Sequence, residues 1–140
     1  MNALLVIANP VSTSFSHAMA EAAKGVLLAH DYHCQVHDLY AEGFHPVQPT
    51  GESGNTTSDD ALVERHCHEL AIADLIREFH PNGWSQPPAI MKGWIERVFR
   101  SATAYAYPAG AGPMAGSTQE QRETWLAEVR EVTRASCAPS

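Results

Sequence analysis

The chain has 140 residues, 44% of them hydrophobic, so it is long enough for one domain with a buried core and too short for two. Its formal net charge of −7, with only nine lysines and arginines, argues against binding to nucleic acid or to an acidic membrane surface. No apolar run approaches the roughly 20 residues of a spanning helix, so we expect no membrane insertion.

The first residues, "MNALLVIANP", lack the basic leader and the small-residue cleavage site of a signal peptide, and we interpret them as a first strand. The three cysteines, Cys34, Cys67 and Cys137, are odd in number and far apart. This pattern favours reduced thiols over a disulfide framework. Together these features predict a cytoplasmic protein.

The first half of the chain has the pattern of strand, helix, strand and long loop. Residues 3–8 form a short continuous apolar run, typical of a strand buried on both faces of a parallel sheet. An amphipathic helix is predicted from about residue 14 to residue 29. Its apolar positions are Met19, Ala22, Ala23, Val26 and Leu27. The alternating segment "HCQVHDLY" (33–40) predicts a second strand, and the turn-rich residues 44–60 predict a loop.

The second half has the pattern of helix, strand and helix. Ser58 with Asp59 and Asp60 predicts a helix start, and the helix should run to about residue 72. The segment "ADLIREF" (73–79) predicts the third strand. Pro87 and Pro88 suit the entrance of a further helix. Its expected buried residues are Ile90, Met91, Trp94, Ile95, Val98 and Phe99.

The C-terminal part is predicted to hold a flexible linker and one more helix. Residues 106–116, "AYPAGAGPMAG", have the composition of a linker. Ser117 with Glu120 forms a capping box ahead of an amphipathic helix that we place at residues 117–136.

This order of elements predicts a single α/β domain over residues 1–140, a doubly wound parallel sheet of about three strands with helices on both faces. Ligands of such sheets bind outside the carboxyl ends of the strands. Two loops leave those ends, "NPVSTSFS" (9–16) after the first strand and "HPNGWSQP" (80–87) after the third. We therefore expect them to face one another across one crevice.

The first of these loops offers hydroxyl groups and an amide at the N-terminus of a helix. Free backbone N–H groups and the helix dipole favour an anion there, and hydroxyls add donors without adding charge. The polar side chains are those of Asn9, Ser12, Thr13, Ser14 and Ser16. The loop lacks the glycines and the lysine of a nucleotide-triphosphate loop. Ordinary helix capping by Ser or Thr is the alternative interpretation.

The second loop has the residues of a pocket for a flat ring. We expect Pro81 and Gly83 to shape a tight turn whose backbone amides point outward, and Trp84 to offer an aromatic wall. The alternative is that Trp84 is a core aromatic, as we expect Trp94 to be. Side chains able to hydrogen-bond the edge of a polar heterocycle are those of Asn82, Ser85 and Gln86.

Several segments resemble one family. "IANPVSTSF" (7–15) and "HPNGWSQPPAIMKGWIERVF" (80–99) look like the two signature stretches of the flavodoxin-like NAD(P)H oxidoreductase family, the quinone reductase and modulator-of-drug-activity type. "DLYAEGFHPV" (38–47) is similar to that family's segment after its second strand, and "STQEQRETWLAEV" (117–129) to its closing helix. The resemblance covers about three quarters of the chain.

The resemblance implies a flavin cofactor, FMN or FAD, and NAD(P)H as electron donor. Ser14, Phe15 and Ser16 fall where the family grips the flavin phosphate. The residues that fall where it cups the isoalloxazine ring are Pro81, Asn82, Gly83, Trp84 and Ser85. The implied reaction transfers two electrons, as hydride, from NAD(P)H through the flavin to a small quinone-like acceptor.

The chain departs from the family pattern at four places. Asn9 stands where the family usually has His, and Gly83 replaces the first of two usual aromatics. The family places two further strands and a helix where this chain has the few residues between Tyr107 and Ser117. Since that segment normally supplies the polar groups nearest the hydride, we name no catalytic acid or base. The chain could therefore be a flavin- or nucleotide-binding regulatory module or a truncated inactive copy.

The fourth departure is the pair Arg77 and Glu78 in a strand that the family keeps apolar. Without a fourth strand the third becomes a sheet edge, where charges prevent strand-to-strand association. Three strands also make a thin core, so we expect a homodimer. Tyr105 and Tyr107 could border an acceptor pocket or could be exposed linker aromatics.

We expect no metal site. On a helix, His66 and His68 lie about 200° apart and cannot bind one ion together. His33 and His37 share a strand face but lack a third and a fourth ligand.

Overall fold

The computed structural model describes residues 1–52, 57–100, 103–104, 123–124 and 127. The chain divides into two compact units, Met1–Ala106 and Tyr107–Ser140, and the strands and helices named below all lie in the first. The predicted linker lies outside the described residues, as do Tyr105, Tyr107 and Cys137. Of the predicted C-terminal helix, Glu123, Thr124 and Ala127 are described, and all three are helical.

Three parallel strands form the sheet, β1 (Asn2–Ile7), β2 (His33–Asp38) and β3 (Leu75–Phe79), in the order β2-β1-β3. The central strand pairs with both neighbours, Ile7 lying opposite Asp38 on one side and Phe79 on the other. Residues 3–6 of β1 are fully buried, which confirms the prediction from the continuous apolar run.

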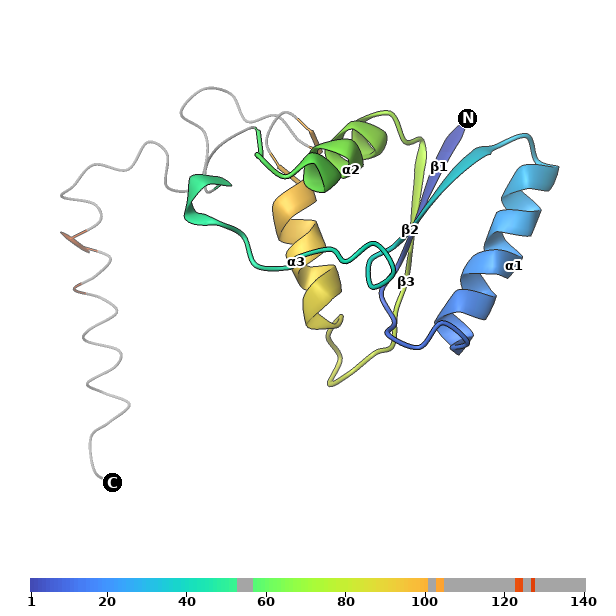
Figure 1. The fold of residues 1–140 in the computed structure, drawn as a ribbon, viewed down its shortest axis with the longest axis horizontal. Coiled ribbons are helices and arrows are strands. Elements are labelled where there is room, and N and C mark those ends of the chain that lie inside the picture. Colours follow the sequence, from blue (N-terminus) through green and yellow to red (C-terminus); the bar gives the residue numbers. More distant parts are fainter. Residues whose placement is uncertain (53–56, 101–102, 105–122, 125–126, 128–140) are drawn as a thin grey trace. The chain divides into compact units, whose positions relative to one another are not determined.

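Helices cover both faces of this sheet. Helix α1 (Phe15–Ala29) lies on one face, and α2 (Ala61–Ala71) and α3 (Ala89–Val98) lie on the other (Figure 1). A short 3₁₀ turn, η1 (Thr50–Glu52), interrupts the predicted loop 44–60. The doubly wound α/β class is thereby confirmed. Among the described residues, none of the helices is both long and apolar enough to cross a membrane.

The main core lies between the sheet and the pair α2 and α3. The predicted apolar face of α3 is confirmed, since Met91, Trp94 and Val98 are fully buried. They pack against β1 and against Val63 and Leu70 of α2. Helix α2 begins as expected after the acidic cluster, with Asp60 as its N-cap.

Helix α1 differs from the sequence prediction. Its buried residues are Ser16 and Ala20, whereas Met19 is 37% exposed and Val26 60% exposed. The periodicity indicated a helix correctly and placed Ala23 and Leu27 on the half-buried side, but it assigned Met19, Ala22 and Val26 to that side wrongly. The side with the least exposure includes Ser16, Ala20, Ala23 and Leu27, which recur three and four residues apart, so apolar residues outside that stripe are left exposed.

Strand β3 is an edge strand in the described part of the chain, since it pairs with β1 alone. Arg77 and Glu78 are both exposed on it. The expected edge position of the charged strand is therefore confirmed for the described residues, and the proposal that these charges prevent pairing with another chain stays a prediction.

The loop after β2 packs tightly on α3. A Cβ atom added to Gly93 would lie 2.2 Å from the carbonyl oxygen of Pro46. Only glycine lets the loop backbone approach the helix this closely. The segment that the sequence presents as an open loop is therefore fixed against α3.

Candidate functional site

The loop after β1 is shaped by its own side chains. Asn9 Oδ1 accepts a hydrogen bond from the backbone N–H of Val11 at 3.0 Å, and Asn9 Nδ2 donates to Ser16 Oγ at 3.3 Å. These two contacts turn the chain from the end of β1 into the first turn of α1. Asn9 thus stabilises the conformation of the loop. The side chains of Ser12 and Thr13, further along the loop, are exposed to solvent.

The N-terminus of α1 is not capped by a side chain. Ser14 is the N-cap residue, with φ −72° and ψ 162°, but its hydroxyl does not bond to the first-turn amides. The hydroxyl instead lies 2.9 Å from Nδ1 of His17. The first-turn N–H groups of α1 therefore remain available to an anion, which argues against ordinary capping as the role of Ser14. Phe15 begins the helix with a side chain that is 77% exposed.

The loop after β3 contains a tight turn held in an unfavourable backbone conformation. Gly83 and Gln86 exchange two backbone hydrogen bonds, of 3.2 and 2.9 Å, around Trp84 and Ser85. Both central residues have positive φ, 53° for Trp84 and 60° for Ser85. Two-residue turns of this kind normally hold Asn, Asp or Gly at these positions. A bulky tryptophan there is an outlier.

This geometry corrects one expectation. Gly83 does not adopt positive φ, and its amide and that of Gln86 bond to each other's carbonyl oxygens, so these two amides are not free. The strain falls on Trp84 and Ser85 instead. The side chain of Trp84 is 100% exposed, which excludes a core role within the described part of the molecule, whereas Trp94 is fully buried as expected.

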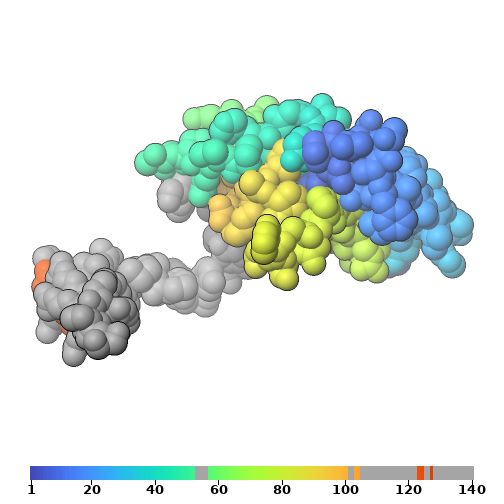
Figure 2. All heavy atoms as spheres, turned by 90° about the horizontal axis from the view of Figure 1, so that it is seen from below, coloured from blue at the N-terminus to red at the C-terminus, as the bar shows by residue number. Residues whose placement is uncertain are grey.

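The two loops leave the sheet from adjacent positions. The backbone N–H of Ala8 donates to the carbonyl oxygen of Phe79 at 2.9 Å, directly before each loop begins. Both loops lie at the lower edge of Figure 1, and Figure 2 looks onto that edge, where loop 80–88 projects from the surface in yellow-green. Pro81 and Asn82 are exposed there together with the turn.

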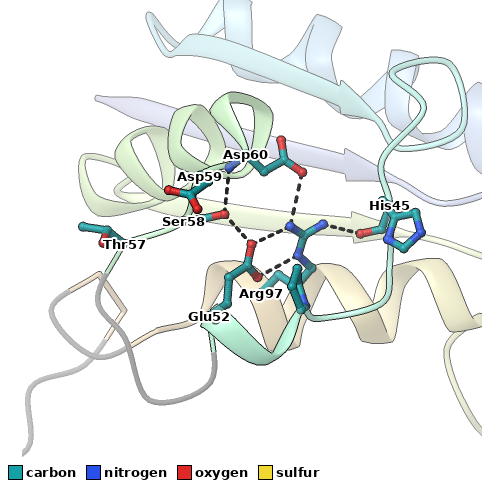
Figure 3. A pocket seen from close by; sticks show the side chains of 9 residues that line it. His45, Glu52, Thr57, Ser58, Asp59, Asp60 and Arg97 are labelled. Carbon is teal, nitrogen blue, oxygen red and sulfur yellow. Dashed lines mark hydrogen bonds and ion pairs between the residues drawn. The ribbon is translucent and has the colours of Figure 1, made fainter.

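A cavity of about 450 Å³ lies elsewhere, at the other end of α3 (Figure 3). Residues of η1, the start of α2 and the last turn of α3 line it, and they include Glu52, Asp59, Asp60 and Arg97. Three carboxylates against one guanidinium make this cavity unsuited to a phosphate. We therefore keep the candidate cofactor site at the two loops.

Arg97 is buried in this cluster and fully engaged. Its Nε donates to Glu52 Oε2 at 2.9 Å, its Nη2 donates to Glu52 Oε1 at 2.6 Å and to Asp60 at 3.2 Å, and its Nη1 donates to the carbonyl oxygen of His45. The hydrogen bond from Arg97 is the largest influence on the pKa of Glu52 and lowers it, and the same bond raises the pKa of Arg97. The pair is a structural tie between η1 and α3.

A second buried polar cluster joins β2 to α2. His37 Nδ1 lies 3.0 Å from Glu42 Oε1, and His37 Nε2 is hydrogen-bonded to Glu69. His66 Nε2 lies 3.2 Å from Glu42 Oε2. Burial by itself raises the pKa of the Glu42 carboxyl group, but the close contacts with His37 and His66 outweigh burial and lower that pKa to about 2.

His37, Glu42 and His66 offer ligand atoms within 4.8 Å of one another, yet their geometry does not suit a metal ion. The rings of His37 and His66 are stacked, with centroids 3.7 Å apart and 29° between their planes, so their in-plane lone pairs do not converge. Trp94 Nε1 also donates to His66 Nδ1 at 2.9 Å. Because indole only donates, we assign the proton of neutral His66 to Nε2, which leaves that atom without a lone pair for a metal.

The structure thus brings the predicted residues of both loops to one edge of the sheet. It also reveals two polar clusters that sequence reasoning missed, one around Arg97 and one around His37. Partners in these clusters are separated by up to 52 residues, as His45 and Arg97 are. No local pattern in the sequence marks such pairs.

An α/β protein with helices on both faces of a parallel sheet, and with loops at the carboxyl ends of β1 and β3, belongs to the doubly wound class, whose ligands bind at this edge. Residues 1–131 match the family model described as flavodoxin-like fold, and the chain belongs to that family. This confirms the resemblance found in the two loop segments.

Curated relatives are named for redox activity. NAD(P)H dehydrogenase [quinone] 1 of Cavia porcellus is 34% identical over 128 residues, which cover 76% of this chain and 46% of that protein. An uncharacterized NAD(P)H oxidoreductase of Haemophilus influenzae is 31% identical, with 75% and 54% covered. The chain spans about half the length of the curated relatives it matches.

A solved structure supports the same relationship. The NAD(P)H:quinone oxidoreductase of Methanothermobacter marburgensis superposes with a TM-score of 0.67 at 27% identity, covering 76% of this chain and 57% of that one. The shared part therefore includes the fold described above and is again little more than half of the relative.

Proposed function

We propose that this chain binds a flavin along the carboxyl edge of β1 and β3 and serves NAD(P)H-dependent reduction of a small quinone-like acceptor. The observation that carries the proposal is the turn at Trp84 and Ser85. Backbone strain of this kind costs of order 1–3 kcal/mol per residue and concentrates at binding sites. In the described residues no packing contact of Trp84 accounts for it, since this side chain is fully exposed.

The chemistry of the two loops fits a flavin. A flat apolar ring needs an aromatic surface, which Trp84 presents, and hydrogen-bonding groups at its polar edge, which Asn82 and Ser85 carry. Pro81 and Gly83 complete that loop. Free N–H groups at Phe15 and Ser16, with the hydroxyls of Ser12 and Ser14, would hold a phosphate at the positive end of the α1 dipole.

When bound, a flavin accepts hydride from NAD(P)H and passes two electrons to an acceptor, chemistry that amino-acid side chains do not supply. The part of this chain is to hold the phosphate, to present Trp84 to the ring and to leave one side of the site open, since nothing lies within 4 Å of a Cβ built at Gly83. FMN and FAD both carry a phosphate, so the loops favour neither.

A second candidate function is a flavin- or nucleotide-binding module without turnover. This alternative needs only the ring- and phosphate-binding groups of the two loops and no further residue. We further propose a homodimer that works in the cytoplasm. The exposed apolar residues of α1, Met19 and Val26 among them, support an association through that helix.

The test is a titration of the purified protein with FMN and with FAD, followed by oxidation of NADH and NADPH in the presence of a quinone. We expect binding that Trp84→Ala weakens by roughly 5- to 100-fold, the range that loss of one aromatic stacking partner gives. Val47→Ala, which removes an exposed apolar side chain from another loop, is the matched control and should bind as the original protein does.

Each result has a definite meaning. Failure to bind either flavin contradicts the proposal, and equal affinities for the Trp84→Ala and Val47→Ala variants contradict the role of the turn. Binding without NAD(P)H oxidation favours the module without turnover. Size-exclusion chromatography with light scattering decides whether the chain is a dimer.

A further inference from the structure

The hydroxyl group of Ser14 is already engaged, although a phosphate at the start of α1 needs it as a donor. Ser14 Oγ lies 2.9 Å from His17 Nδ1, and His17 Nε2 lies 2.9 Å from Asp38 Oδ2. The histidine comes from the first turn of α1 and the aspartate from the end of β2. The three side chains therefore form a hydrogen-bonded chain that begins beside the uncapped amides of α1.

The direction of each hydrogen bond depends on whether His17 carries one proton or two. An ionised carboxylate only accepts, so the N–H of His17 Nε2 donates to Asp38 in both states. In neutral His17 the lone pair of Nδ1 accepts from the Ser14 hydroxyl. Ser14 then has no hydrogen for an anion and presents only lone pairs, which repel it.

A second proton on His17 reverses its hydrogen bond with Ser14. The N–H of Nδ1 then donates to Ser14 Oγ, so the hydroxyl hydrogen is released and can turn toward an anion at the amides of Phe15 and Ser16. The imidazolium also places a positive charge beside that anion, and its attraction adds to that of the helix dipole. Both changes strengthen the binding of a negative group.

Asp38 holds His17 in place in both states. Its Oδ1 accepts hydrogen bonds from the backbone N–H groups of Tyr40 and Ala41, both at 3.2 Å, so its Oδ2 faces the histidine in one orientation. The side chains of His17 and Asp38 are 16% and 25% exposed, so protons reach them from solvent. The dipole disfavours a cation in the first turn of a helix, and the carboxylate offsets this.

The other ionisable side chains on this side of the sheet do not contact His17 in the described part of the chain. Strand β1 has none, and His37 of β2 lies on the opposite face, where it bonds to Glu69. Groups that act on His17 only through space are Glu21 and Lys24 of α1, Cys34 of β2, Arg77 of β3 and His80 of the loop that follows. Asp38 is thus the group that controls the charge of His17 by direct contact.

We propose that His17 is a positioning residue of the phosphate site and that phosphate binding is coupled to uptake of a proton from solvent at His17 Nδ1. The inference rests on the phosphate role proposed for the loop after β1. The site holds a phosphate ester more tightly as the pH falls through the range in which histidine gains its proton, about pH 8 to 5. By linkage, the bound phosphate favours the charged form of His17.

The test uses inorganic sulfate and FAD, two anions whose own charge is constant between about pH 5.5 and about pH 8, where histidine titrates. Riboflavin, which lacks a phosphate, is the comparison. Calorimetric titrations of the flavin-free protein at both ends of this range, in two buffers of different ionisation enthalpy, give affinity and proton uptake. We expect sulfate and FAD to bind roughly 3- to 30-fold more tightly at the lower pH, the screened effect of a nearby opposite charge. Riboflavin affinity should not change.

Three variants separate a proton-linked role from a merely structural one. His17→Gln keeps a hydrogen-bonding side chain that does not titrate, so its affinity for sulfate and FAD should be equal at both pH values. Asp38→Asn should also flatten the pH dependence, because an amide N–H bonded to His17 Nε2 competes with the second proton. A structural role would lower affinity equally at both pH values. His30→Gln is the matched control, since it removes an exposed imidazole from the opposite end of α1 and should keep the pH dependence.

The outcomes distinguish this inference from the proposed function. If FAD binds equally well at both pH values, or if His17→Gln keeps the full pH dependence, the inference fails and the flavin site stands. If sulfate binds with proton uptake but neither flavin binds, the inference holds and the redox function fails. Absence of binding by both sulfate and FAD overturns both.

Nuclear magnetic resonance of the His17 ring in the original protein needs no variant to fold. Added sulfate should raise the protonated fraction of His17 at a given pH, and an unchanged fraction would overturn the inference.

Discussion

The loops that follow β2 and β3 have opposite characters. The loop after β2 buries Leu39 and Phe44, carries Glu52 into an ion pair with Arg97, and touches the backbone of α3 at Gly93. Residues 81–86 of the loop after β3 are all exposed, and two of them have positive φ. Contacts with the rest of the protein hold the loop after β2 in place. The loop after β3 lacks such contacts at its turn, yet it has an unfavourable backbone conformation there.

The difference separates structural polar residues from candidate functional ones. Polar groups of the loop after β2 find partners within the protein and stabilise it. Those of the loop after β3 face solvent. No contact among the described residues offsets the unfavourable backbone conformation of the turn at Trp84 and Ser85. Breaking contacts of the loop after β2 should therefore lower the stability of the fold. Relieving the backbone strain in the loop after β3 should raise it.

The largest expected effect is at Arg97. Arg97→Met leaves Glu52 buried without its partner, and we expect the free energy of unfolding to fall by about 3–5 kcal/mol. Urea unfolding measures it. Lys92→Met breaks an exposed ion pair with Glu96 on the same helix and should cost less than about 1 kcal/mol. Equal losses in the two variants would remove the distinction between the loops.

The next effect is a pH dependence through Glu42. Its pKa is about 2 in the folded protein and near 4.5 when unfolded, so its stabilising contribution is complete above pH 4.5 and is lost as the pH falls toward 2. One pKa unit corresponds to about 1.4 kcal/mol. Because solvent screens the partly exposed Glu42, we expect a contribution smaller than the full shift would give, on the order of 2 kcal/mol. Glu42→Gln should flatten the fall of stability across this range, whereas the exposed Glu21→Gln should not. Parallel curves for all three proteins would contradict this.

Gly93→Ala tests the contact between the loop after β2 and α3. The new methyl group would overlap the backbone of Pro46, and we expect a loss of roughly 1–3 kcal/mol, measured by thermal and urea unfolding. Gly25→Ala in α1 meets nothing within 4 Å and should instead stabilise by roughly 0.5–1 kcal/mol, since alanine favours helix. A gain at both positions would show that the loop is free to move away.

The smallest effect is at the strained turn. Ser85→Gly removes the penalty for positive φ and should raise the free energy of unfolding by up to about 1 kcal/mol while lowering flavin affinity a few-fold. Asp31→Gly relieves a similar φ of 60° at the end of α1 and should gain stability without changing flavin affinity. If both variants bind flavin equally well, the strain at Ser85 has no role in binding.

Much of the fold was predictable because it rests on local patterns. The apolar run of β1, the caps before α2 and the buried face of α3 each depend on residues within a few positions of one another. The face of α1 was only partly predictable, because the helix has apolar residues on more than one side and the buried side begins with a serine, Ser16. In the sequence, nothing near Arg97 indicates that it is buried. Its role becomes apparent only in the structure, where Glu52 pairs with it.

The candidate site divides in the same way. The sequence located both loops, because strand ends in a parallel sheet share one edge. It expected Pro81 and Gly83 to shape a tight turn with outward-pointing amides. In the structure the amides of Gly83 and Gln86 bond to each other's carbonyl oxygens, and the positive φ values fall on Trp84 and Ser85. The contact of His17 with Asp38 joins helix to strand across 21 residues, and sequence spacing alone gave no sign of it.

The placement of the tryptophans has a practical consequence. Trp94 is wholly enclosed in the core, and Trp84 is wholly in water. An enclosed indole fluoresces at shorter wavelength than a hydrated one and is shielded from iodide, so the two signals separate by colour and by quenching. The protein thus carries one optical reporter of its folding and another of the turn after β3, and a Trp125→Phe background would leave these two alone.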